Sequence, residues 1–482
     1  MLELQKQKKW PFFSLLSLPA TAMGFALSVQ ISALSWILTT QYGLDIHDVG
    51  LVWAAGPLAG IIGQVLIGII SDKVWFWNGR RRPFILIGGV IAALMLLALP
   101  NIGVISSAMG FEGVLGVAIA VALTLDLAIN ISFNPTRAII ADVTEEGHER
   151  TRGYTWMQTI SGTFGVLAYA IGAWFDNFVL IYFGVFLVLA FSLIPPFFVE
   201  EPRDLEAPSS GPPESPESPK KSEDSIGQIL MAIRPLWGFL IYDVYAMGLR
   251  LAGIEFEHYY AEIACGVITL VLIVITLMEK DVAEGASPDD THIGGFRKVL
   301  AAHSFSWIGI QTTFVFMVPF LLFQLPDLSD VDAGRVGSTA FLVLNAVGAL
   351  LPALVLNPLS HRIGLVKTHV ICLVCMTAGY VGLYYMGTSP MAIFVLMAVV
   401  GIGWAAIVSL PFAIMSEKVN QAAMGLYMGL FNLSVVLPQL VVSLGIALFV
   451  SRAPDKDIIF AISAISLAIS AVSWAFVRKV ES

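Results

Sequence analysis

The chain has 482 residues, of which 57% are hydrophobic and 13% are charged, and its mean hydropathy is +0.82. These values lie far outside those of soluble globular domains and predict an integral membrane protein that uses lipid as its solvent. The formal net charge is −9. In a membrane protein the placement of Lys and Arg matters more than their sum, and no basic tract that would bind nucleic acid is present.

The three cysteines, Cys265, Cys372 and Cys375, all lie within apolar runs. Their odd number argues against a disulfide scaffold, and their spacing is not that of metal ligands. We therefore interpret them as buried, unreactive thiols and expect neither a bound metal nor an organic cofactor.

The N-terminal sequence MLELQKQKKWPFF joins a basic stretch to a long apolar run that lacks a cleavage site, so we predict a cytoplasmic tail, residues 1–14, before a retained span. A spanning helix needs about 20 apolar residues. Six such runs follow, at about 15–40, 48–71, 83–103, 113–141, 154–175 and 178–199. They predict an N-terminal six-helix bundle, residues 15–199.

Residues 200–226 are rich in proline, serine and charge and cannot form a core, which predicts a solvated cytoplasmic linker. Six further apolar runs lie at about 300–324, 336–357, 368–388, 390–415, 421–449 and 458–477. They predict a C-terminal six-helix bundle, residues 300–482. Six spans, a linker and six spans form the layout of an all-α transporter whose two halves move about a central site.

An additional segment, residues 227–299, holds a mixed run at 230–249 and a clean apolar run at 263–277. With twelve spans, all the strongly basic loops fall on one side, which the positive-inside rule makes cytoplasmic: Lys73 with Arg80–Arg82, Arg150 with Arg152, Arg362 with Lys367, and Arg478 with Lys479. The insertion must then cross the membrane an even number of times or not at all. We predict an inserted hairpin, with fourteen spans and both termini cytoplasmic. In the alternative, 230–249 is an interfacial helix and 263–277 is re-entrant.

Asp126 lies near the middle of the fourth apolar run. A carboxylate is costly at that depth, so an intramembrane acid normally faces a cavity, a partner or a proton route. Asn130 and Arg137 follow four and eleven residues later and project from the same helix face. The alternatives are a neutral, hydrogen-bonded Asp126 of structural importance and an interfacial Arg137 that reaches toward water.

Amide side chains recur in the other runs and give a candidate substrate site. Amides both donate and accept hydrogen bonds, as sugar hydroxyls do, and tryptophan rings offer flat faces to a pyranose. Each amide taken alone is explained equally well as a contact between helices. Together with Asn130, the candidates are Gln30, Gln64, Gln158, Trp307, Gln311, Asn345, Trp404, Asn432 and Gln439.

The loop GIISDKVWFWNGRRRPF, between the second and third runs, contains Asp72, Arg80, Arg81 and Arg82. A short basic loop can simply anchor the topology. Its order of Gly, Asp and Gly-Arg-Arg-Arg-Pro also resembles the cytoplasmic signature of the major facilitator superfamily, and PLSHRIG at 358–364 resembles a weakened second copy. We predict that charge pairs at this motif close the inner mouth of the protein.

Both halves resemble the glycoside–pentoside–hexuronide transporters of that superfamily, in particular the plant sucrose transporters and the bacterial sucrose or maltose proton symporters. In this family the acid of the fourth helix couples the proton, and an arginine eleven residues later belongs to the same charge system; Asp126 and Arg137 match these positions. The matching segments are FALSVQIS (25–32), VWAAGPLAGIIGQVLIG (52–68), GRRRPFI (79–85), LDLAINISFNPTRAIIAD (125–142), VSLPFAIMSE (408–417) and MGLYMGLFNLSVVLPQL (424–440).

The resemblance implies a monomer in the cell membrane that performs proton-coupled symport of a sugar, such as the disaccharides sucrose or maltose, by alternating access. The alternatives are a sodium-coupled or uncoupled glycoside transporter and a non-transporting sugar sensor. An enzyme is not expected, because the sequence contains no HExxH metal motif, GxSxG nucleophile elbow or phosphate-binding glycine loop. The insertion at 227–279 departs from the family's twelve-helix pattern.

Overall fold

The computed structural model describes residues 3–60, 70, 74–145, 148–202, 226–252, 254, 258–280, 293–419 and 424–477. This part of the chain is built from helices and contains no β-strand. Within it, 11 helices, some continued across short breaks, are long and apolar enough to cross a membrane. The prediction of an all-α, multi-pass membrane protein is therefore confirmed.

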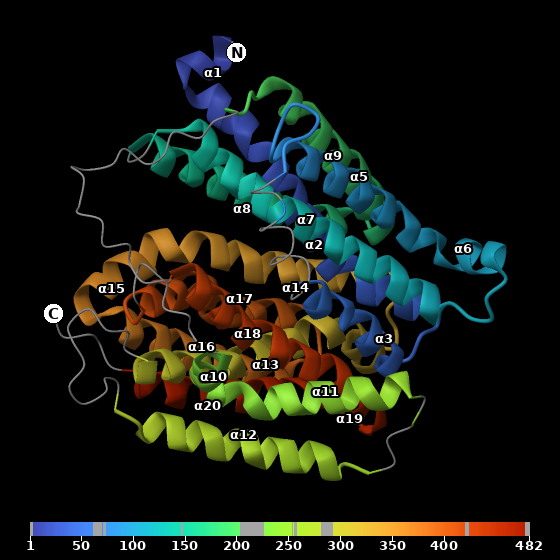
Figure 1. Cartoon of the computed structure of the whole chain (residues 1–482). Helices are drawn as coiled ribbons and strands as arrows, with labels where there is room; N and C mark the ends of the chain where they lie inside the picture. The colour runs from blue at the N-terminus through green and yellow to red at the C-terminus, as the bar shows by residue number, and fades with distance from the viewer. Residues whose placement is uncertain are drawn as a thin grey trace.

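The N-terminal half forms the upper part of Figure 1. Its helices are α1 (Glu3–Gln7), α2 (Trp10–Thr40), α3 (Ile46–Trp53), α5 (Arg82–Ala98), α6 (Ile102–Met109), α7 (Leu115–Val143), α8 (His148–Trp174) and α9 (Asn177–Phe198). The first span begins at Trp10, before the predicted residue 15, because Pro11 is readily accepted in the first turn of a helix. The third span is longer than predicted, since α5 continues through a 3₁₀ turn, Leu99–Asn101, into α6.

The C-terminal half and the inserted segment form the lower part of Figure 1. Their helices are α10 (Ile226–Ala232), α11 (Trp237–Leu251), α12 (Tyr260–Met278), α13 (Ile293–Gln324), α14 (Asp330–Leu351), α15 (Asn357–Ile363), α16 (Leu365–Met386), α17 (Pro390–Ser416), α18 (Met424–Val441), α19 (Ala447–Arg452) and α20 (Ile458–Ala475). Two π-helical segments, Pro352–Leu356 and Val442–Ile446, join α14 to α15 and α18 to α19. Such insertions locally widen a helix and often mark functional regions.

Helices α11 and α12 form a hairpin along the outside of the C-terminal half (Figure 1). The two helices approach closely because Gly238 of α11 leaves room for Thr269 of α12. Phe239 packs its ring 6.0 Å from that of Phe305 on α13. The start and the end of the hairpin are joined by an ion pair of 2.6 Å between Arg234 and Glu279, so the segment runs along the bundle and returns. This geometry fits the predicted hairpin better than an interfacial helix followed by a re-entrant segment.

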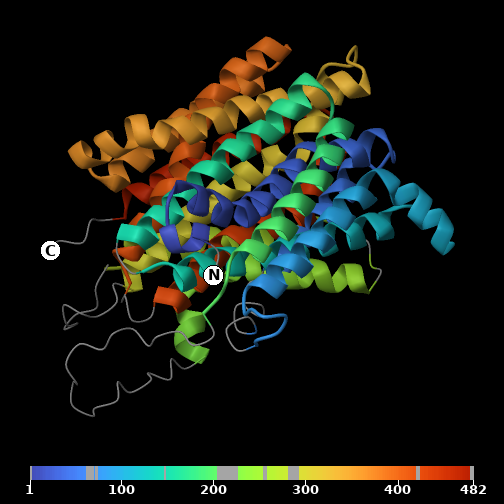
Figure 2. The same ribbon diagram turned by 90° about the horizontal axis from the view of Figure 1, so that it is seen from above.

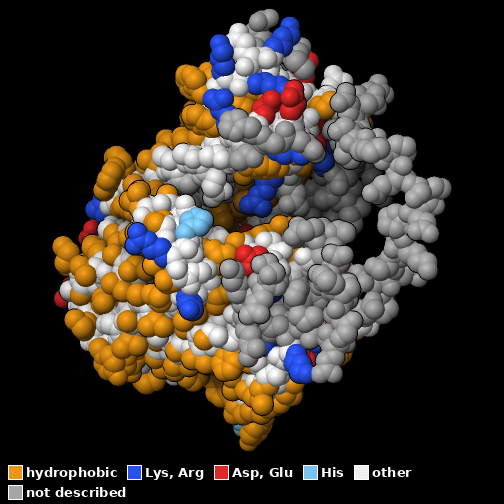
Figure 3. Space-filling view, turned by 90° about the vertical axis from the view of Figure 1, so that its left-hand side faces the viewer, with side chains coloured by type: hydrophobic (Ala, Val, Ile, Leu, Met, Phe, Trp, Pro, Cys, Tyr) orange, Lys and Arg blue, Asp and Glu red, His pale blue; other side chains and the backbone are white. Residues whose placement is uncertain are grey.

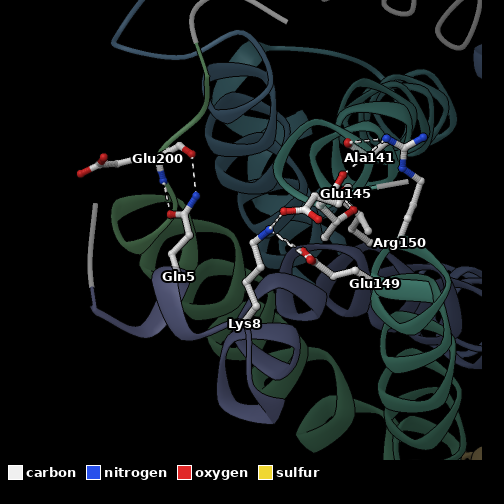
Figure 4. A network of polar contacts seen from close by, with 9 residues as sticks. Gln5, Lys8, Ala141, Glu145, Glu149, Arg150 and Glu200 are labelled. Carbon is white, nitrogen blue, oxygen red and sulfur yellow. Dashed lines mark hydrogen bonds and ion pairs between the residues drawn. The ribbon is translucent and has the colours of Figure 1, made fainter. Parts of the chain in front are cut away.

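The first and last described helices, α1 and α20, have their outer ends at one end of the bundles together with the start of the linker, and we call this the linker end (Figures 1 and 2). The side-chain amide of Gln5 exchanges two hydrogen bonds of 2.9 Å with the backbone of Glu200. Lys8 contacts Glu145 and Glu149, at 3.3 and 3.0 Å, in the connection between α7 and α8 (Figure 4). These contacts fix the N-terminal helix to the ends of α7, α8 and α9.

The two halves contact each other at the opposite end, which we call the far end. On one flank, where α8 meets α14, the Arg335 guanidinium donates to the backbone carbonyl of Phe175 at 2.5 Å. Nearby, the Trp36 indole N–H donates to the Asp330 carbonyl at 2.7 Å, and the hydroxyls of Ser32 and Ser338 lie 2.7 Å apart. At the linker end the surface is hollowed between the two halves (Figure 3).

On the other flank of the far end, α3 packs directly on α19 and the π-helical segment before it. A Cβ placed on Gly50 would overlap with the Cβ of Ala447 and lie 2.8 Å from the carbonyl oxygen of Ser443. Glycine at position 50 therefore permits the closure of the far end, because any side chain would separate the two helices.

Gly50→Ala should shift the protein toward a state that is open at the far end, since the added methyl group cannot be accommodated in the closed contact. The matched control is Gly116→Ala, because Gly116 also lies in a helix and no atom within 4 Å meets its added Cβ. Reporter cysteines at each end, labelled with a water-soluble maleimide, measure the balance. Equal labelling patterns for both variants would contradict the role of Gly50.

The hairpin prediction is tested by labelling from each side of the membrane. Tyr260, at the start of α12, is 75% exposed. In a protein without its native cysteines, Tyr260→Cys should react with an impermeant maleimide added to intact cells, whereas Lys280→Cys should react only after permeabilisation. Labelling of position 260 from the cytoplasm alone would show that the insertion does not cross the membrane twice.

Candidate functional site

Asp126 lies on the buried face of α7, with only 6% of its surface exposed. The side-chain amide of Gln30, on α2, donates a hydrogen bond of 2.8 Å to its Oδ2 atom. Gly56 lies against the same carboxyl group, since a Cβ at that position would be 3.3 Å from Oδ2. The carbonyl oxygen of the Gln30 side chain is buried and has no hydrogen-bond partner among the described residues. Two of the predicted site residues thus form one polar pair in the membrane interior.

Asn130 and Arg137 lie on the same helix as Asp126 but have different environments. The Asn130 amide donates to the backbone carbonyl of Asp126 at 2.8 Å. Arg137 places its guanidinium over the Phe133 ring, 4.5 Å from the centroid. No ion pair joins Asp126 to Arg137 in the described part of the chain, as expected from their separation along a helix that stays regular through Pro135.

Arg137 instead lines an open cavity of about 510 Å³. Gln158, a second predicted site residue, lines the same cavity from α8, together with Tyr154 and Thr155. The Tyr154 hydroxyl donates to the Arg137 carbonyl at 3.2 Å and holds α8 against α7. The cavity therefore combines a cation with hydroxyl and amide groups, which suits a polar solute.

Five predicted residues come together in the C-terminal half. The Trp404 indole N–H donates to the Asn345 side-chain oxygen at 3.2 Å, and its ring meets that of Trp307 edge to face, 6.2 Å between centroids. The Gln439 amide donates to the side-chain oxygen of Gln311 at 3.1 Å. We call Trp307, Gln311, Asn345, Trp404 and Gln439 the C-terminal polar cluster. Its aromatic faces and amides are the groups that bind sugars, although its internal hydrogen bonds also hold helices together.

Sequence reasoning missed two members of this region. His303 is 2% exposed, and its Nε2 atom accepts a hydrogen bond of 2.9 Å from the Trp307 indole. Phe314 packs its ring 5.4 Å from that of Trp404. His303 could have been found from the sequence, because a histidine four residues before a tryptophan lies on the same face of a helix. Phe314 could not, because a phenylalanine within an apolar run does not stand out. Asn432 is half-buried and does not belong to the cluster, and Gln64 lies outside the described residues.

The basic motif joins three helix ends of the N-terminal half. Arg81 and Arg80 contact the Asp142 carboxylate at the end of α7, at 3.0 and 3.9 Å. Glu201, after α9, accepts hydrogen bonds of 2.7–2.8 Å from the backbone N–H groups of Arg80, Arg81 and Arg82. Asp142 and Glu201 were not predicted as site residues. Their position as acids at the ends of apolar runs could have indicated partners for the basic loop. Asp72 lies outside the described residues, so the gating role of the motif stays a prediction.

Two helical halves, closed against each other at one end and hollowed at the other with polar groups between, define a transporter of the alternating-access class. The sequence profile of the Major Facilitator Superfamily matches residues 16–443. The chain belongs to this superfamily, and the prediction that it is a transporter and not an enzyme is confirmed.

Individual relatives agree with this assignment. The chain is 24% identical over 477 residues to the sucrose transport protein SUC4 of Arabidopsis thaliana, covering 88% of this chain and 81% of that protein. It is 28% identical over 192 residues to the general alpha-glucoside permease of Schizosaccharomyces pombe, covering 36% and 34%.

Solved structures share the fold at low sequence identity. The POT family transporter PepTSo is similar with a TM-score of 0.65 at 12% identity, covering 97% of this chain and 98% of that one. The nucleoside transporter NupG is similar with a TM-score of 0.60 at 12% identity, covering 99% and 100%.

Gln439 and Gln158 should respond differently to substitution, because only the first is bonded within the cluster. Gln439→Leu leaves the Gln311 oxygen unpaired, and Gln311 is only 3% exposed. We expect a cost of about 1–3 kcal/mol in stability, measured as a lower unfolding temperature in detergent. Gln158→Leu should leave that temperature unchanged and weaken solute binding. If Gln158→Leu instead lowers the unfolding temperature and Gln439→Leu does not, Gln158 is the residue that holds helices together.

Proposed function

We propose that this protein is a proton-coupled sugar symporter, and that Asp126 carries the proton. The observation that supports the proposal most strongly is the buried carboxyl group of Asp126, bonded to Gln30 in the interior of a membrane-spanning half. Intramembrane acids of this kind are typical of proton relays in transporters. The similarity to proteins named as sucrose and alpha-glucoside transporters supports a sugar as the solute.

In this mechanism the two halves rock about a site between them. Asp126 is protonated while the far end is open, sugar then binds, and opening of the linker end releases both to the cytoplasm. Entry of a proton down a membrane potential of 100 mV contributes about 2.3 kcal/mol to the accumulation of sugar. The linker end is assigned to the cytoplasm of a cell-membrane protein because it carries the arginines of the basic motif. The described structure then corresponds to an inward-open state.

The sugar would be recognised between the C-terminal polar cluster and the cavity beside Arg137. Trp307 and Trp404 are only half-buried, so ring surface on both is accessible for stacking on a pyranose. Amides that bond each other before sugar binds can exchange these bonds for bonds to sugar hydroxyls at little net cost. A disaccharide such as sucrose or maltose is the expected substrate, carried by a monomer without a further cofactor.

Sodium coupling, uncoupled transport and sugar sensing are the alternative functions. Uptake into vesicles in which sodium is replaced by choline separates proton from sodium coupling. Counterflow of labelled sugar in proteoliposomes separates a transporter from a sensor, because a sensor binds sugar without carrying it.

Asp126→Asn should abolish accumulation of sugar driven by an imposed pH gradient. Asparagine keeps the size and hydrogen-bonding capacity of aspartate but cannot ionise, so no titrating group remains to link the two fluxes. Sugar binding and exchange should survive and lose most of their pH dependence. The measurement is uptake per molecule of protein in the membrane, with and without a protonophore.

A purely structural aspartate gives a different result: less folded protein, but normal proton-driven accumulation per folded molecule. If Asp126→Asn still concentrates sugar in a manner that the protonophore abolishes, the proton is carried by another residue and the proposal is wrong. Asp142→Asn serves as a control for the loss of an acid on the same helix, since Asp142 lies at its end and pairs with Arg81 of the predicted gate. It should change the rate of transport but leave the remaining accumulation sensitive to the protonophore.

A further inference from the structure

A groove of about 710 Å³ lies on the far-end flank where α3 faces the inserted hairpin. Its walls come from both halves and from the insertion: α3 and α7 of the N-terminal half, α11 of the hairpin, and the π-helical segment with α19 of the C-terminal half. The volume falls within the range of about 300–1,000 Å³ that is usual for ligand pockets. The sugar-transport mechanism uses none of its lining residues.

The groove is amphipathic, with its charge at one end. His47 is the second residue of α3, Arg250 lies in the last turn of α11, and Arg452 ends α19, so all three lie at the far end. The other residues that line the groove in the described structure are apolar. Asp48, on α3, does not line the groove but lies close enough to Arg250 for its carboxylate to attract the guanidinium. Leu58 and Leu123 extend the apolar wall one to three turns deeper into the membrane-spanning region.

We propose that this groove binds an anionic phospholipid, with its phosphate at Arg250 and Arg452 and an acyl chain along the apolar wall. Two arginines that line one groove, at the far ends of α11 and α19, complement a phosphate, to which guanidinium groups donate strong hydrogen bonds. Basic pockets between membrane helices are a known form of lipid head-group site on the cytoplasmic side, and this groove offers the same chemistry at the opposite end. A sugar or a free phosphate ion is polar throughout and would make no use of the apolar wall, so neither explains the whole groove.

The position of the groove links lipid binding to the state of the transporter. Arg250 contacts both halves, since its guanidinium lies 3.3 Å from His47 Nε2 on α3 and donates to the Leu444 carbonyl at 3.3 Å. Opening of the far end must separate α3 from α19 and so move His47 away from Arg452. A ligand that needs both walls binds the far-end-closed state better and stabilises it. The lipid thus stabilises the same contact, between α3 and α19, that the small size of Gly50 permits.

The opposite flank offers a matched control. There Arg335 also bridges the halves at the far end, but it bonds the Phe175 carbonyl and pairs with Asp332 at 3.3 Å. Arg335→Gln therefore removes one cation from the same end of the protein without touching the groove. Leu123→Trp tests the acyl-chain portion separately, because it narrows the apolar wall and leaves every charge in place.

The experiment measures phospholipid bound to the full-length protein by native mass spectrometry, during titration with phosphatidylglycerol or phosphatidylcholine. The wild type should bind phosphatidylglycerol preferentially. Arg452→Gln should weaken that binding about tenfold, as expected for the loss of a hydrogen bond to a charged group, and Arg250→Gln by at least as much. Leu123→Trp should weaken the binding of both lipids. Arg335→Gln removes a far-end bridge outside the groove, so any weakening should be equal for the two lipids and the preference for phosphatidylglycerol should stay as in the wild type.

Equal binding of the two lipids by the wild type would overturn the proposal. Unchanged binding in Leu123→Trp would also overturn it, as would a loss of the preference for phosphatidylglycerol in Arg335→Gln equal to that in Arg452→Gln. Inorganic phosphate should not compete with phosphatidylglycerol at millimolar concentration; competition would show a site for the free anion. In liposomes, phosphatidylglycerol should decrease maleimide labelling at the far end of the wild type, and this decrease should be lost in Arg452→Gln. These readouts do not depend on which solute is carried.

Discussion

A carboxyl group in the interior of a lipid-embedded helix must receive its hydrogen bonds from the protein, because lipid offers none. Asp126 receives one from Gln30, and this hydrogen bond links α7 to α2 in the interior of the N-terminal half. The approach depends on the small residue Gly56, which leaves space beside the carboxylate. Any change that moves these helices apart leaves two buried polar groups without partners, so the pair favours the close packing of α7 on α2.

The far end shows how the two halves meet without being permanently fused. On the flank of α8 and α14, the contacts are hydrogen bonds from Arg335 and from small hydroxyl side chains to groups of the other half. On the flank of α3 and α19, the contact is close packing at Gly50. Short polar and small-residue contacts separate at modest cost, which a rocking transporter requires. Among its described residues, the inserted hairpin reaches the flank of α3 and α19 through Arg250.

Helix existence and type were predictable from hydropathy because lipid forces every spanning segment to satisfy its own backbone. Helix boundaries were less predictable. The first span extends back to Trp10, and the third continues into α6, since polar and proline-containing turns do not interrupt these helices as an apolar-run criterion assumes. The π-helical segments, including Val442–Ile446, had no signal in the sequence, because their extra residue fits the packing of neighbouring helices.

The sequence by itself determined that this chain is a multi-pass, two-half transporter and that Asp126 is an unusual buried acid, because both follow from the cost of polar groups in lipid. Only the tertiary structure decided which amides pair with which: Gln30 with Asp126, and Gln439 with Gln311. It also showed that Asp142 and Glu201 bind the basic motif. Periodicity gives the face of a helix on which a residue lies, but the identity of the neighbour across that face depends on how separate spans pack.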